Sequence, residues 1–251
     1  MKILRCKQHG ADGLPTATWL RARRGRPTAS RFADIITPLG KTRTGQTPIA
    51  YMHELAAERI TGQSGGHYVT AAMERGTALE PQARAWYELS RGVDVREVGM
   101  VMPDHARWGC SPDGLVGDDG GLEIKCPLPK AHVSALLDGG AAYSVQVQAS
   151  LWITGRAWWD VMIYTDVPRL PNAVFRVDPD PAMHAALDAA LPDFCGRLDE
   201  IEARLIAMGA GEQAAREHEQ AEDDRIEQWF RDFEAGPSGE YDAETREGGE
   251  T

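Results

Sequence analysis

Residues 110–126 carry the feature that most restricts the fold of this chain: two short segments separated by a tight-turn sequence. The turn, at residues 117–120, reads Gly-Asp-Asp-Gly, and these residue types favour chain reversal. We therefore predict that residues 110–114 and 121–126 form two paired strands of one sheet. Such a hairpin determines which side chains of the two strands lie next to each other.

The second predicted strand alternates apolar and charged residues. Leu122 and Ile124 share one face of it. Glu123 and Lys125 share the other face, because successive side chains of a strand point to opposite sides of the sheet. Pairing of the two strands brings Asp113 alongside the charged face. The sequence thus predicts two carboxylates and one lysine gathered at the sheet.

Two neighbouring carboxylates and a lysine suit the hydrolysis of a phosphodiester. The carboxylates of Asp113 and Glu123 repel each other, and a hard divalent cation such as Mg²⁺ or Mn²⁺ relieves that repulsion. One or two such ions stabilise charge on a phosphodiester and lower the pKa of bound water. The ammonium group of Lys125 would orient that water or stabilise the transition state, and the backbone carbonyl of Ile124 would add a metal ligand.

The residues Pro-Asp at 112–113 and Glu-Ile-Lys at 123–125 form the pattern of the PD-(D/E)xK nucleases. The bare pattern is weak, because it also describes a hairpin with a surface Glu–Lys pair. The surrounding sequence is more specific, since residues 109–115 and 121–127 closely resemble the bacteriophage lambda-type exonucleases, the YqaJ-like viral recombinases. The resemblance runs over about residues 17–208 and also includes Trp19, Arg23, residues 28–30, residues 146–148 and residues 151–154.

The resemblance implies further members of the metal site. Glu80 matches the upstream acidic residue of the family and would be a third carboxylate ligand. Gln146 matches the glutamine that completes the catalytic set with Glu80, Asp113, Glu123 and Lys125. Gln148 is the alternative to Gln146, so that one of the two is expected to reach the site and the other to face the core.

The resemblance also implies a pocket for the 5′-phosphate of a DNA end. Arg23, Ser30 and Ser111 match the family's residues for that role. An arginine fork and two hydroxyl groups are suitable ligands for a terminal phosphate, and Ser30 is expected near a helix N-terminus, where anions are favoured.

The order of the predicted elements indicates an α/β fold. The resemblance specifies it as a restriction-endonuclease-like PD-(D/E)xK core, with a central mixed β-sheet flanked by helices. We expect a nuclease domain over residues 1–210 and an acidic, partly helical or disordered tail over residues 211–251. Helices are predicted at residues 31–36, 47–62, 70–90, 130–137, 141–152, 181–208 and 213–233, with breaks or kinks near Pro81 and Pro192, and strands at residues 94–102, 110–114, 121–126, 158–164 and 173–177.

The charge of the chain is unevenly distributed, which the net charge of −11 conceals. Residues 1–45 hold ten Lys and Arg against two Asp, whereas residues 212–251 hold fourteen acidic residues against four Arg. A basic N-terminal part is compatible with nucleic-acid binding despite the acidic total. The four cysteines have no metal-ligand spacing and are expected to be free thiols, and the absence of a long apolar run favours a cytoplasmic protein that does not contact membranes.

The predicted function is a Mg²⁺-dependent 5′→3′ exonuclease that degrades linear double-stranded DNA from 5′-phosphorylated ends. It would release mononucleotides and leave a 3′ single strand for recombination. The resemblance further implies a ring-shaped homotrimer around DNA, a phage single-strand annealing protein as partner, and a bacterial host. The alternatives are a restriction-type endonuclease, a RecB- or Cas4-like nuclease, and a non-catalytic DNA-end-binding protein.

Overall fold

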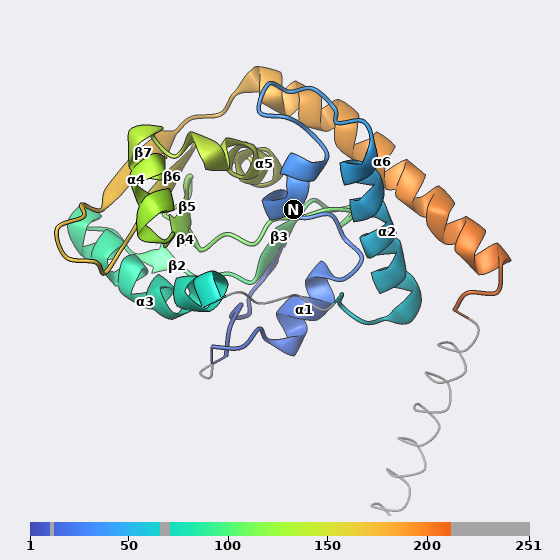
Figure 1. Cartoon of the computed structure of the whole chain (residues 1–251), viewed down its shortest axis with the longest axis horizontal. Helices are drawn as coiled ribbons and strands as arrows, with labels where there is room; N and C mark the ends of the chain where they lie inside the picture. Colours follow the sequence, from blue (N-terminus) through green and yellow to red (C-terminus); the bar gives the residue numbers. More distant parts are fainter. Residues whose placement is uncertain (11–12, 66–70, 212–251) are drawn as a thin grey trace, which may run out of the picture.

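The computed structural model describes residues 1–10, 13–65 and 71–211 of the 251-residue chain (Figure 1). Its centre is a five-stranded sheet in the order β2-β4-β5-β6-β7. Strands β5 and β6 are parallel, and the other three pairs are antiparallel. The predicted mixed sheet is therefore confirmed. Its strands are β2 (Val95–Arg96), β4 (Gly114–Val116), β5 (Gly120–Lys125), β6 (Trp158–Ile163) and β7 (Ala173–Val177).

A second, two-stranded sheet pairs β1 (Lys2–Leu4) with β3 (Met100–Met102) in antiparallel orientation. The prediction of one strand over residues 94–102 is wrong, because β2 and β3 belong to different sheets. Gly99 lies at the change of direction, and a Cβ atom there would stand 2.3 Å from Sγ of Cys6. Gly99 also donates to the backbone carbonyl of Leu4 at 2.9 Å, so the N-terminal segment packs directly against this bend.

The hairpin that carries the predicted acids is shorter than expected. Residue 110 does not pair with β5, because Cys110 exchanges backbone hydrogen bonds with Val101, at 2.9 and 2.8 Å. Pro112 has no N–H to donate, so the strand begins only after it. As a result Asp113 directly precedes β4, whose first residue, Gly114, pairs with Leu122.

Six α-helices and two 3₁₀ helices are present in the described residues. The break predicted as one possibility near Pro81 is absent, since α3 runs through Pro81 as α6 runs through Pro192, and each helix keeps a buried apolar face on both sides of its proline. The helices are α1 (Ala17–Arg23), α2 (Gln46–Thr61), α3 (Ala71–Arg91), α4 (Pro129–Leu137), α5 (Ser144–Thr154) and α6 (Pro181–Ala207), and the 3₁₀ helices are η1 (Ala29–Asp34) and η2 (Ala141–Tyr143).

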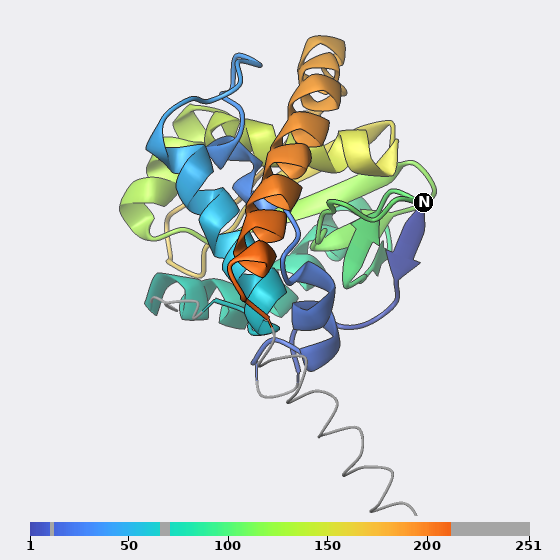
Figure 2. The same cartoon turned by 90° about the vertical axis from the view of Figure 1, so that its right-hand side faces the viewer.

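Helices cover both faces of the sheet (Figure 1). On one face α3 packs Leu79 and Tyr87 against Leu122 and Met162. On the other face α2, η1, α5 and α6 form the larger core around β6, and α6 lies along α2 (Figure 2). Because side chains alternate along β5, its charged residues face α5 rather than α3. The fold thus places Glu123 and Lys125 between the sheet and α5.

No helix among the described residues is both long enough and apolar enough to cross a membrane. The predicted acidic tail, apart from Gly211, and its helix over residues 213–233 lie outside the described residues. The division into a nuclease domain and a tail therefore stays a prediction.

Candidate active site

A closed network of three side chains occupies the space between β5 and α5. Nζ of Lys125 lies 2.7 Å from Oε1 of Glu123. Gln146 donates to the same carboxylate oxygen at 2.5 Å and accepts from Lys125 at 3.1 Å. Glu123 is only 3% exposed, so this carboxylate is desolvated and depends on its partners for compensation. The network fixes the position of all three side chains.

Asp113, which directly precedes β4, lies beside this network. Its Oδ2 accepts a hydrogen bond from the backbone N–H of Ile124, at 2.6 Å. The bond holds the Asp113 side chain against the part of β5 that carries Glu123 and Lys125. The structure therefore brings together the three residues that the hairpin pattern predicted as neighbours.

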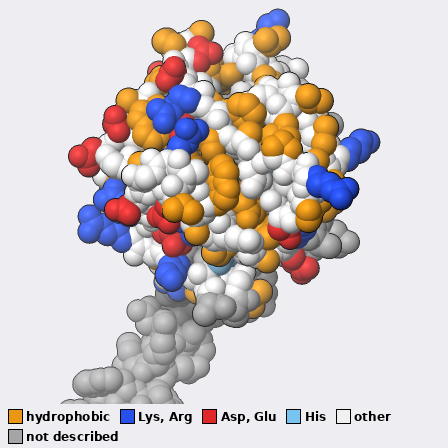
Figure 3. All heavy atoms as spheres, turned by 90° about the vertical axis from the view of Figure 1, so that its left-hand side faces the viewer, with side chains coloured by type: hydrophobic (Ala, Val, Ile, Leu, Met, Phe, Trp, Pro, Cys, Tyr) orange, Lys and Arg blue, Asp and Glu red, His pale blue; other side chains and the backbone are white. Residues whose placement is uncertain are grey.

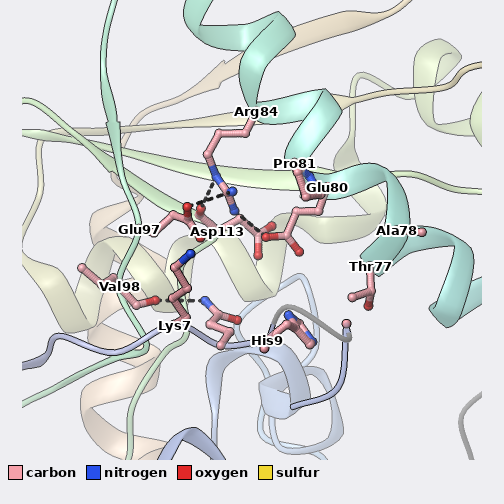
Figure 4. Close-up of a pocket in the computed structure, with 13 residues that line it drawn as sticks. Lys7, His9, Thr77, Ala78, Glu80, Pro81, Arg84, Glu97, Val98 and Asp113 are labelled. Carbon is pink, nitrogen blue, oxygen red and sulfur yellow. Dashed lines mark hydrogen bonds and ion pairs between the residues drawn. The ribbon is translucent and has the colours of Figure 1, made fainter. Parts of the chain in front are cut away.

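Glu80 reaches the same region from α3. Its Oε1 pairs with Arg84, one helical turn away, at 2.5 Å. Arg84 also donates to the backbone carbonyl of Asp113 at 3.3 Å and lies 3.4 Å from Glu97. Glu80, Arg84 and Asp113 line one cleft of about 330 Å³ (Figure 4). Arg84 was not predicted as a site residue, although its spacing of four residues from Glu80 was a usable signal.

The electrostatics of this cleft reflect crowded carboxylates. Burial raises the pKa of Asp113 well above its ordinary 3.8, and Glu123 and Glu80 raise it further against the opposing effect of Lys125. Burial also raises the pKa of Glu80, against the opposing effect of Arg84. For Lys125, burial lowers the pKa, but Glu123 and Asp113 more than compensate, so that the net shift is upward. Lys125 therefore stays charged, whereas the carboxylates of the site have too few cationic neighbours to neutralise them.

The donor chemistry of these acids fits a divalent cation. Oε2 of Glu123 is buried and has no hydrogen-bond partner among the described residues. A buried anionic oxygen without a partner is costly unless a cation compensates it. In the described part of the chain, however, no group of three or more His, Cys, Asp or Glu side chains is arranged to hold a metal ion. At Glu80, Oε1 of the carboxylate accepts a hydrogen bond from Arg84.

The two candidate glutamines have different surroundings. Gln146 contacts the Glu123–Lys125 pair. Gln148 is buried and bonds the backbone of Asp178 and Asp180 at 2.8 and 2.9 Å, which connects α5 to the start of α6. Of the two, Gln146 is the one that lies at the acids.

The three predicted phosphate ligands also converge. Arg23 donates from Nη1 to Ser111 at 3.0 Å, and from Nη2 to Thr28 at 3.1 Å and Ser30 at 3.3 Å. The indole N–H of Trp19 donates to Ser111 at 3.0 Å, and the Arg23 guanidinium lies over the Trp19 ring. Burial lowers the pKa of Arg23, a sign that its charge is poorly solvated.

The residue that sequence reasoning missed here is Thr28. Thr28 precedes a helix, but its side chain makes no capping bond and instead accepts from Arg23. The helix it precedes, η1, is a 3₁₀ helix of six residues. A favourable helix end for an anion at Ser30 is therefore not available, and the anion-binding chemistry of this pocket comes from Arg23 and the hydroxyl groups.

Taken together, the fold and the site define a class. A mixed sheet flanked by helices, with an acid pair and a lysine at its central hairpin, is the restriction-endonuclease-like architecture of the PD-(D/E)xK nucleases. This fold class, predicted from the sequence, is confirmed.

Comparisons with known proteins identify the family. The sequence matches the YqaJ-like viral recombinase domain over residues 18–157. The crystal structure of an alkaline exonuclease from Laribacter hongkongensis has 38% sequence identity and a TM-score of 0.69, and the match covers 77% of this chain and 98% of that one. The same exonuclease in complex with dAMP has 37% identity, with the same TM-score and coverage. The chain therefore belongs to the YqaJ-like viral recombinase family, and the prediction of an exonuclease of this type is confirmed.

A more distant structure supports the fold alone. A phage-related exonuclease from Haemophilus somnus shares 13% identity at a TM-score of 0.60, over 72% of this chain and 96% of that one. A comparison with curated proteins found no match.

Proposed function

We propose that the chain is a Mg²⁺-dependent 5′→3′ exonuclease that degrades linear double-stranded DNA from 5′-phosphorylated ends. Each cycle would release one mononucleotide and leave a longer 3′ single strand, as phage-type recombination by strand annealing requires. The proposal extends the exonuclease assignment of the family to a substrate, a direction and an ion.

The observation that carries the proposal is the short chain distance between the phosphate pocket and the acids. Ser111 bonds to Arg23, whereas Asp113, two residues further on, bonds to Ile124 beside Glu123. Two residues of chain span at most about 7 Å. A phosphate held by Arg23 and Ser111 would therefore place the next phosphodiester of the strand near the acids, which suits removal of one nucleotide at a time.

The residues proposed to hold the ion are Asp113, Glu123, the backbone carbonyl of Ile124, and Glu80. The chemistry that one or two Mg²⁺ ions, or Mn²⁺ in their place, supply in such a site is stabilisation of negative charge on the phosphodiester and a lower pKa for water. To contribute, Glu80 would have to exchange Arg84 for the cation. The unpartnered Oε2 of Glu123 supports the proposal.

Lys125 is the proposed catalytic cation. Its ammonium is oriented by Glu123 and Gln146 and lies 5.0 Å from the centre of the Tyr143 ring, so that its position is defined from three sides. There it would orient the attacking water and stabilise charge on the phosphorus centre. The water oxygen bonds to phosphorus, the 3′-oxygen leaves, and the remaining strand keeps a new 5′-phosphate.

The phosphate pocket contains hydroxyl groups that can still donate a hydrogen bond to a substrate. Oγ of Ser111 already accepts from both Trp19 and Arg23, so its own O–H is free to point at a further acceptor. Thr28 and Ser30 likewise accept from Arg23, and because their hydroxyl oxygens lie 3.3 Å apart and share one hydrogen bond, one of the two hydroxyl protons is left for a further acceptor. A terminal phosphate would be the shared acceptor of these groups.

The test uses linear duplex DNA labelled at one 3′ end and closed circular DNA of the same sequence, each incubated with Mg²⁺. We expect stepwise shortening of the labelled strand from its 5′ side, on linear DNA only, and none with Asp113→Asn. Cutting of the circle would favour a restriction-type or RecB-like endonuclease instead. Binding of linear ends without any hydrolysis would favour the non-catalytic end-binding protein.

We also propose that the protein forms a homotrimer around DNA in the cytoplasm of a bacterial host and acts with a phage single-strand annealing protein. Exposed apolar side chains support a subunit contact: Leu128, Val133 and Leu137, in and just before α4, are 50%, 41% and 85% exposed. The side of the molecule on which α4 lies in Figure 1 shows apolar side chains across its middle (Figure 3). Sedimentation of the purified protein would show whether three chains associate.

A further inference from the structure

The N-terminal segment, residues 7–10, is part of the wall of the candidate active-site cleft. Lys7, Gln8 and His9 line the cleft that Glu80 and Asp113 also line. In Figure 4 this segment lies opposite α3, and the Lys7 side chain extends toward the acids. No role follows for this segment from the function proposed above.

Specific hydrogen bonds fix the segment to the site. The Gln8 amide donates to the carbonyl of Pro112 at 2.6 Å and to that of Val98 at 3.1 Å. Pro112 directly precedes Asp113. The segment is therefore attached to the backbone that positions one of the proposed metal ligands.

The same segment is attached to the phosphate pocket. Thr16 donates from its backbone N–H to the carbonyl of Gln8 and from its hydroxyl to the carbonyl of Lys7, both at 2.8 Å. The Thr16 oxygen in turn caps α1, the helix that carries Trp19 and Arg23. Residues 7–10 consequently connect the two clusters that the proposed reaction uses.

The charges of the cleft give Lys7 its significance. Three carboxylates line it, those of Glu80, Glu97 and Asp113, and they repel a DNA strand. Arg84 is the other long-chain cation of the lining, and it is already paired with Glu80 and Glu97. Within the described ranges, the Lys7 ammonium has no hydrogen bond or ion pair, and the residue is exposed.

We propose that Lys7 binds a backbone phosphate of the DNA strand that occupies this cleft, and that the N-terminal segment is thus part of the substrate-binding surface. The inference rests on the proposed function for the identity of its ligand, DNA. Lys7 offsets the repulsion between the cleft carboxylates and the strand, and it acts on binding rather than on the bond-breaking step. It is a DNA-binding residue and not a catalytic one.

The test compares Lys7→Gln with Lys2→Gln, which removes the same charge from β1, outside the cleft. Affinity for a 5′-phosphorylated duplex is measured by fluorescence anisotropy at several salt concentrations, in a chelating buffer that leaves the DNA intact. Loss of one phosphate contact lowers the slope of log affinity against log salt by about 0.9. We expect that decrease for Lys7→Gln, recovery in Lys7→Arg, and the wild-type slope for Lys2→Gln.

A kinetic measurement in Mg²⁺ provides the second readout. Lys7→Gln should raise the KM for DNA about threefold to tenfold at unchanged kcat, as expected for a contact that binds ground state and transition state equally. Equal salt slopes for the Lys7 and Lys2 variants would overturn the inference. The anisotropy assay needs no hydrolysis, so a wild-type protein that binds DNA without cleaving it would contradict the proposed function while the Lys7 contact is still tested.

Discussion

At the scale of single residues, the crowding of acids around Asp113 has a consequence for stability. Its raised pKa means that the folded protein binds a proton that the unfolded chain has already released. The free energy of unfolding therefore falls as pH rises from about 4 through the raised folded pKa. We expect the melting temperature of metal-free protein to fall across that window, and Asp113→Asn to reduce the fall, with the remainder due to Glu80, whose pKa is also raised by burial.

The matched control is Asp119→Asn, in the exposed turn of the same hairpin, which should keep the wild-type dependence. Addition of Mg²⁺ at the high end of the window should raise the melting temperature of wild type but not of Asp113→Asn, because a ligand stabilises only the form that binds it. An unchanged pH profile in Asp113→Asn would show that Asp113 is not the group responsible.

The residue-scale predictions from sequence succeeded where local geometry was sufficient. Alternation along one strand placed Glu123 and Lys125 together, and a tight turn brought Asp113 to them. Arg84 and Thr28 were missed for a different reason. Their contacts depend on how α3 and η1 pack against the hairpin. The periodicity of the sequence does not indicate that packing.

At the scale of elements, the glycines at the start of β5 are required by the neighbouring strand. A Cβ atom at Gly121 would stand 2.2 Å from the Trp159 ring, and Trp159 is fully buried. Gly121→Ala should therefore destabilise the protein by about 1–3 kcal/mol, the usual cost of overpacking a core. Urea denaturation would measure the change.

Gly196→Ala is the contrasting variant, because Gly196 lies inside α6 with nothing within 4 Å of an added Cβ. Alanine there should stabilise by about 0.5–1 kcal/mol, since it reduces the freedom of the unfolded chain and favours the helix. If both variants lost a similar amount of stability, glycine content itself, rather than the Trp159 contact, would determine the response.

Element boundaries were predictable only where the neighbours in space were also neighbours in sequence. The prediction of a hairpin strand beginning at residue 110 was wrong because Cys110 pairs with Val101 in β3. The prediction of one strand over residues 94–102 was wrong because β3 pairs with β1 in a separate sheet. Both errors come from pairing with segments that the local pattern does not reveal. Helix α5 and strand β7, whose periodicity is local, lie close to their predicted positions.

At the scale of the whole molecule, α6 is the last described helix and contributes to the larger core. Leu191, Phe194 and Leu198 of that helix are buried against the rest of the fold. Deleting residues 212–251 removes fourteen acids and four arginines and should leave the rate of DNA hydrolysis within about twofold of wild type, or slightly higher at low salt because repulsion of DNA is reduced. A gel-based nuclease assay and a melting curve on the shortened chain would check this. Loss of activity with an unchanged melting temperature would assign a role in hydrolysis to the tail.

The central claim is that a pocket for a 5′-phosphate adjoins the hydrolytic site, and Arg23 is its principal member. The most direct measurement is the ratio of initial rates on 5′-phosphorylated and 5′-hydroxyl linear duplexes, for wild type and Arg23→Gln. A charge-assisted contact of about 1.5–3 kcal/mol predicts a wild-type preference of about tenfold to a hundredfold. The account predicts that Arg23→Gln lowers this ratio to near one while still hydrolysing hydroxyl ends. A wild-type ratio of one, or a ratio unchanged in Arg23→Gln, would contradict it.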